Sequence, residues 1–107
     1  MKNLVIHPQD CTTSFLSLIY APIINKTVIT GGITKSELHE LIETHDRIIM
    51  LGHGTPYGLL SVGQFPDAEF CIIDGSMVDV LMKKKDNIYI WCNADLFVFF
   101  NDLKKSD

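Results

Sequence analysis

The residues of this chain best suited to chemistry are a histidine and a cysteine, each near the end of a short apolar run. His53 stands between two glycines in the segment RIIMLGHG (47–54), and Cys92 closes the segment NIYIWC (87–92). A glycine on each side lets the backbone turn sharply and lets another group come close to the imidazole. This pattern indicates that His53 is presented at the edge of a sheet and has a partner there.

Both apolar runs are typical of buried strands in a parallel sheet. Catalytic groups gather at the carboxyl ends of such strands, so neighbouring strands would bring the thiol and the imidazole to one edge. The expected chemistry is that of a cysteine–histidine dyad, in which His53 accepts the proton of the Cys92 thiol. A helix starting near Ala94 would favour a thiolate, and the amide of Gly54 is a candidate donor to an oxyanion.

The elements that must position this pair indicate one α/β domain over residues 1–107. Buried strands are expected at 3–8, 26–32, 47–52 and 87–92, with a hairpin or irregular excursion at 58–74. Helices are expected at 12–22, 34–45 and 76–86, and a last element at 94–105. The alternation of strands and helices predicts a three-layer sandwich around a mainly parallel sheet.

The helix over 34–45 has the strongest signal, because Thr34 and Glu37 form a capping box. Apolar spacing also predicts which side of each helix faces the core. The residues assigned to these core-facing sides are Phe15, Leu16, Ile19 and Tyr20, then Leu38, Leu41 and Ile42, then Met77, Val78, Leu81 and Met82.

The blocks ending in His-Gly and in cysteine resemble the caspase-like cysteine peptidases, the group that also holds gingipains, legumains and separases. In that family a hydrophobic block ends in His-Gly, a helix intervenes, and a second hydrophobic block ends in the nucleophilic cysteine. The resemblance covers Lys26 to Asp95 and implies a caspase-like topology, His53 as base and Cys92 as nucleophile toward a protein or peptide substrate. The pair is 39 residues apart, from 53 to 92, against roughly 50 in caspases. Trp91 stands where the family usually has a small residue.

The C-terminal segment differs from the family in length. Only residues 93–107 follow Cys92, whereas the substrate-binding strands of the family normally come after the cysteine. We therefore expect a domain that is short at its C-terminal end and lacks a complete specificity pocket. The run from Leu96 to Phe100 is apolar at every position, which indicates a homodimer interface.

Composition restricts the partners. The net charge is -4 and the only basic run, 83–85, sits beside Asp86, so nucleic acid is not expected. No apolar run reaches signal-peptide or membrane-spanning length, which predicts a cytoplasmic protein without membrane contact. The three cysteines form no CxxC pair and the histidines lack metal-ligand spacing, so neither metal nor cofactor is predicted. We expect His7, His39 and His45 to be structural or solvent-facing.

Three alternatives stay open from the sequence. Cys92 could be an ordinary buried strand cysteine, as Cys11 and Cys71 are expected to be. The domain could also be a catalytically silent caspase-like module that acts in interaction or assembly through its apolar C-terminal segment. The third alternative is a flavodoxin-like domain that binds a small anion at the glycine turn TGGIT (30–34), which lacks the lysine of a P-loop.

Overall fold

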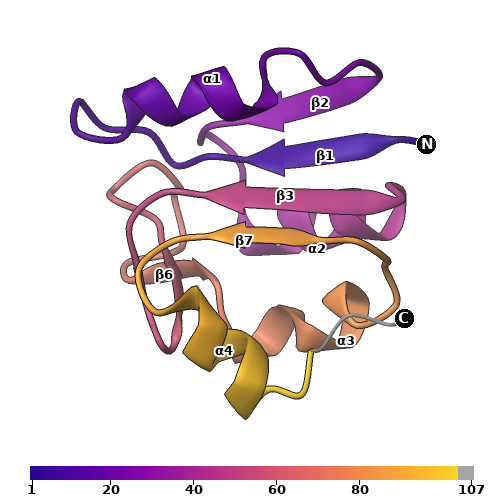
Figure 1. Cartoon of the computed structure of the whole chain (residues 1–107). Coiled ribbons are helices and arrows are strands. Elements are labelled where there is room, and N and C mark those ends of the chain that lie inside the picture. The colour runs from indigo at the N-terminus through magenta and orange to yellow at the C-terminus, as the bar shows by residue number, and fades with distance from the viewer. Residues whose placement is uncertain (104–107) are drawn as a thin grey trace.

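The chain folds around a four-stranded parallel sheet with the strand order β2-β1-β3-β7 (Figure 1). The computed structural model describes residues 1–103. The strands of this sheet are β1 (Asn3–Ile6), β2 (Lys26–Ile29), β3 (Arg47–Leu51) and β7 (Ile88–Ile90). All three neighbouring pairs run parallel, which confirms the sheet type expected from the sequence.

The central strands β1 and β3 are buried on both faces. Successive residues of a strand point to opposite faces, so Leu4 and Ile6 enter the larger hydrophobic cluster while Val5 enters the smaller one. In β3, Met50 and Leu51 divide between the clusters in the same way, and the four apolar side chains from Ile48 to Leu51 are fully buried. A strand covered on both faces needs an uninterrupted apolar run, which is what the sequence supplies.

Helices cover both faces of the sheet. The 3-10 turn η1 (Ser14–Leu16) and the helix α1 (Ser17–Tyr20) contribute Leu16 and Tyr20 to the smaller cluster. The larger cluster is covered by α2 (Lys35–Glu43), η2 (Gly75–Met77), α3 (Val78–Leu81) and α4 (Ala94–Phe100). No helix within residues 1–103 has the length and apolar character needed to cross a membrane.

The capping box predicted at the start of α2 is present. The Thr34 hydroxyl accepts the amide of Glu37 at 3.1 Å, and the Glu37 carboxylate accepts the amide of Thr34 at 2.9 Å. Leu38 and Ile42 are fully buried on the inner face, as their spacing predicts. Local sequence and tertiary packing therefore agree for this helix.

A second, smaller sheet begins in the segment that follows β3. It is antiparallel and contains β4 (Gly54–Thr55), β5 (Gly58–Leu60) and β6 (Cys71–Ile73) in that order. The hairpin predicted within 58–74 is confirmed, but the sheet begins earlier, immediately after His53. His53 therefore joins the main sheet to this excursion.

Two predictions about the first half of the chain are wrong. Strand β2 is not buried but lies at the edge of the sheet, with Lys26, Thr27 and Val28 exposed. The helix expected at 12–22 is short and starts with a 3-10 turn, which rotates side chains away from the α-helical spacing. As a result, Phe15 and Ile19 are exposed.

The helices near the C-terminus are also shorter than expected. Because α3 ends at Leu81, Met82 is exposed and Val80 is buried in its place. The last predicted element ends as a helix at Phe100, and its final two residues, 104–105, lie outside the described part of the chain. Only one side of α4 is covered, with Phe97 buried.

Candidate active site

His53 and Cys92 follow adjacent strands at the carboxyl end of the main sheet. Leu51 of β3 pairs with Ile90 of β7, and the Gly52 amide donates to the Ile90 carbonyl at 3.1 Å. His53 stands two residues beyond this pair on one strand, and Cys92 two residues beyond it on the other. The dyad predicted from the sequence requires that these two strands be neighbours, and they are.

Both side chains are accessible. Cys92 is exposed, so its interpretation as an ordinary buried cysteine is wrong, and the His53 side chain is 42% exposed. Cys11, which we expected to be buried, is also exposed because it lies in the open loop after β1. Cys71 is buried as expected, and burial raises the pKa of its thiol, which makes it a poor nucleophile.

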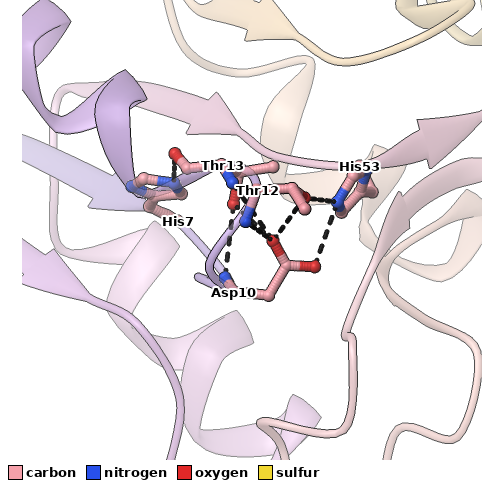
Figure 2. A network of polar contacts seen from close by, with 5 residues as sticks. All are labelled: His7, Asp10, Thr12, Thr13 and His53. Carbon is pink, nitrogen blue, oxygen red and sulfur yellow. Dashed lines mark hydrogen bonds and ion pairs between the residues drawn. The ribbon is translucent and has the colours of Figure 1, made fainter.

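The hydrogen-bond partners of His53 come from the loop after β1 (Figure 2). Its Nε2 lies 3.0 Å from Oδ2 of Asp10 and 2.7 Å from Oγ1 of Thr12. Cys92 is not a hydrogen-bond partner of His53 within residues 1–103. The imidazole therefore belongs to a network with β1 on one side, while β7 and its cysteine lie on the other side of β3.

The contacts of Nε2 determine which ring nitrogen of His53 carries the proton. A carboxylate oxygen only accepts, so the nitrogen that faces Asp10 must donate. The Thr12 hydroxyl donates to Oδ1 of Asp10 at 2.7 Å, and its oxygen accepts from the same Nε2–H group. Nδ1 has no hydrogen-bond partner among residues 1–103. In the neutral ring Nδ1 is therefore the basic nitrogen.

Asp10 is kept ionised by its own turn. The hydrogen bond from the Thr12 hydroxyl lowers the pKa of Asp10 below its ordinary value, and the amides of Thr12 and Thr13 and the charge of His53 act in the same direction. The two amides donate to Oδ1 at 2.9 and 3.1 Å. Sequence reasoning missed Asp10 and Thr12. The available signal was an aspartate followed two and three residues later by threonines, after the first strand, a pattern typical of an Asx-turn.

The amide of Gly54 points away from β5. The Leu60 amide donates to the His53 carbonyl at 2.9 Å, so these two residues form a hydrogen-bonded pair. Because such pairs alternate along an antiparallel ladder, Gly54 and Leu59 form the next, non-hydrogen-bonded pair. The ladder therefore leaves the Gly54 amide available to a ligand on its other side.

Trp91, the residue before Cys92, packs against the small sheet. Its ring is nearly buried, lies close to Gly54 and donates from Nε1 to the Thr55 carbonyl at 3.0 Å. This contact explains why a bulky residue can precede Cys92, since the glycine leaves room for the indole.

Two amides of the TGGIT turn, and the amide of the residue that follows it, already have acceptors. The Gly32 amide donates to the Gln64 carbonyl at 2.8 Å, the Thr34 amide to Glu37, and the Lys35 amide to Oδ1 of Asp67 at 2.9 Å. Two of these acceptors are carboxylates, which would repel an anion. The turn therefore offers little support for the flavodoxin-like alternative.

Comparison of the chain with family models, curated proteins and solved structures gave no match.

Proposed function

We propose that this chain is a cysteine peptidase-like domain of caspase-like topology, in which Cys92 is the nucleophile and His53 the base. The observation that carries the proposal is the equivalent position of the two residues beyond adjacent parallel strands. The strand order and the antiparallel excursion after β3 support the topology. The exposure of Cys92 supports its role as an attacking group.

In the proposed reaction the Cys92 sulfur adds to the carbonyl carbon of a peptide bond, and the thiol proton passes to Nδ1 of His53. The carbonyl oxygen becomes an oxyanion that accepts a hydrogen bond from the Gly54 amide. Collapse of this intermediate breaks the C–N bond while His53 returns the proton to the leaving amine. Water then hydrolyses the thioester, which releases the carboxylic acid and restores the thiol.

Asp10 has the role of an orienting group in this reaction. Its carboxylate and the Thr12 hydroxyl hold Nε2 of His53, and the negative charge favours the imidazolium that forms after proton transfer. A ring fixed at one nitrogen presents the other in a constant direction, which is the requirement for a general base.

Alkylation by iodoacetamide, followed by mass spectrometry of each cysteine, tests the dyad. Cys11 serves as an internal reference because it is also exposed. At neutral pH we expect Cys92 to react about tenfold faster than Cys11, and His53→Ala to remove that difference. His39→Ala is the matched control, since His39 also contacts a carboxylate, that of Asp79 at 3.2 Å.

A Cys92 that reacts no faster than Cys11, and whose rate is the same after His53→Ala, would rule out the dyad. The catalytically silent module would then be the better description of the domain. Covalent capture of Cys92 by peptidyl chloromethyl ketones, compared with iodoacetamide, would further separate peptide recognition from general thiol reactivity.

The exposed end of α4 favours a second candidate function, the association of two copies. Phe99 and Phe100 are 75% and 67% exposed, and their rings pack edge-on at 5.7 Å. A cavity of about 470 Å³, lined in part by Tyr89 and Val98, adjoins the same helix. Apolar side chains gathered in this way are typical of a protein interface.

Light scattering after size exclusion tests this association. We expect a homodimer that becomes monomeric when Phe99 and Phe100 are both replaced by serine. Phe15→Ser is the matched control, because Phe15 is 66% exposed on the opposite side of the sheet and lies outside the proposed interface. A wild-type chain that is monomeric at its highest soluble concentration would contradict this candidate.

A further inference from the structure

His7 is a fully buried histidine at the base of the loop that holds His53. It directly follows β1, and its ring is 0% exposed. Nε2 lies 3.1 Å from the carbonyl oxygen of Thr13, and Nδ1 lies 2.8 Å from the hydroxyl of Tyr20 (Figure 2 shows the Thr13 contact). The reaction proposed above does not use this ring.

The two contacts of His7 allow one neutral tautomer. A carbonyl oxygen only accepts, so Nε2 carries the proton and donates to Thr13, while Nδ1 accepts from the Tyr20 hydroxyl. Burial lowers the pKa of His7, although the Thr13 hydrogen bond and the charge of Asp10 oppose this shift. The side chain of Gln9 is the other polar group at Nδ1, at 3.4 Å.

Thr13 connects this ring to the candidate active site. Its carbonyl accepts from His7, while its amide donates to Oδ1 of Asp10 at 3.1 Å. The other oxygen of Asp10, Oδ2, holds Nε2 of His53 at 3.0 Å. A continuous series of polar contacts therefore runs from the first histidine to the second through a four-residue turn.

We propose that His7 is a positioning residue for His53. Its bond to the Thr13 carbonyl fixes the turn, so that Asp10 and Thr12 hold His53 in the tautomer with its proton on Nε2. The functional consequence rests on the proposed dyad, because an unprotonated Nδ1 is what Cys92 requires. The positioning itself can be measured without any reaction.

Two substitutions separate the contacts of His7. The amide of His7→Gln reaches the position of Nε2 and can still donate to Thr13, whereas the amide of His7→Asn reaches only the position of Nδ1. Each variant buries one polar amide, so the two are matched in chemistry. The readout is the set of ¹⁵N chemical shifts of the His53 ring in the whole chain, which distinguishes its tautomers, with circular dichroism as the check on folding.

We expect the wild-type chain and His7→Gln to keep His53 mainly protonated on Nε2, and His7→Asn to raise the Nδ1-protonated population severalfold. A folded His7→Asn variant with an unchanged His53 tautomer would overturn the proposal. The wild-type chain provides a test even if both variants unfold, because His7 itself must show the proton on Nε2. A proton on its Nδ1 would remove the bond to Thr13 and with it the inference.

Alkylation of Cys92 in the same samples distinguishes this inference from the proposed function. If Cys92 is unreactive in the wild-type chain but the His53 tautomer follows the substitutions, the dyad fails and the positioning role stands. If Cys92 is reactive and His7→Asn leaves both the tautomer and the rate unchanged, the dyad stands and the positioning role fails.

Discussion

The indole ring of Trp91 lies directly against the α-carbon of Gly54. A β-carbon at residue 54 would stand 1.9 Å from Cδ1 of Trp91, a distance that no side chain can adopt. The contact joins the residue before Cys92 to the residue after His53. It therefore fixes the separation of the two loops from which the proposed nucleophile, base and oxyanion donor come.

Replacement of Gly54 by alanine is expected to destabilise the fold, because the nearly buried indole must move to admit the methyl group. We expect the free energy of unfolding in urea to fall by about 1–3 kcal/mol. Gly75→Ala is the matched control, since its β-carbon would meet its nearest neighbour at 3.9 Å and should change stability by less than about 0.5 kcal/mol. Equal stability of both variants would contradict the packing of Trp91 on Gly54.

Replacement of Asp10 by asparagine should slow the alkylation of Cys92 by about tenfold, because the amide removes the charge that favours the His53 imidazolium. Asp79→Asn provides the control, since Asp79 contacts His39 in a similar way at a distant site. The site-specific rate is measured by mass spectrometry at neutral pH. An Asp10→Asn rate equal to that of the wild-type chain would show that Asp10 plays no part in the reactivity of Cys92.

Val62 has a backbone conformation that is unfavourable for a β-branched residue. Its φ is +44° and that of Gly63 is +74°, and the Gln64 amide donates to the Ser61 carbonyl at 3.0 Å. Positive φ at both central residues is the pattern of a type I′ turn, for which Asn-Gly is preferred and a β-branched residue is strained.

We therefore expect Val62→Asn to raise the free energy of unfolding by about 1 kcal/mol. The same change in β2, Val28→Asn, should lower it, because asparagine is unfavourable in strands. Thermal unfolding of the two variants gives the comparison. Destabilisation of equal size at both positions would show that the Val62 backbone is not strained.

Stability should fall as the pH is lowered below 6.5. Burial lowers the pKa of His7, so unfolded chains take up a proton near the ordinary value of 6.5 that the folded chain takes up only at lower pH. The contribution of neutral His7 to stability is therefore complete above pH 6.5, and it is lost as the pH falls toward the pKa of His7 in the folded state. Urea denaturation at several pH values between 7.5 and 5.5 measures the slope.

His7→Gln has no titrating group at this position and should show a shallower slope over that range. If its slope equals that of the wild-type chain, the loss of stability comes from the titration of another group. The carboxyl of Asp10 does not confuse the comparison. Its pKa lies below the ordinary value, so its contribution is lost only under more acidic conditions.

The parts of the fold that were predictable are those in which local sequence and burial agree. The apolar runs of β1 and β3 are fully buried, and the Thr34 capping box starts α2 as expected. The alternation of strands and helices also predicted that His53 and Cys92 follow neighbouring strands. These features depend on residues close together in the chain or on the general rule for crossover connections.

The parts that were not predictable depend on tertiary position. Nothing in the β-branched run 26–29 indicates an edge strand, because the position of β2 in the sheet is set by its pairing with β1. The contact of Thr12 with His53 crosses a sequence separation of 41 residues, and the Trp91 contact with Thr55 crosses 36. Composition and spacing do not encode such contacts.

The same separations have a kinetic consequence. Parallel pairing between distant segments imposes a large loop-closure cost and slows folding. A chain leaving the ribosome can form β1, β2 and β3 together, but Cys92 reaches the carboxyl edge of the sheet only when β7 docks on β3. The proposed dyad would therefore be assembled late in biosynthesis, in a single step, because partially synthesised chains would contain an oriented His53 but not yet Cys92.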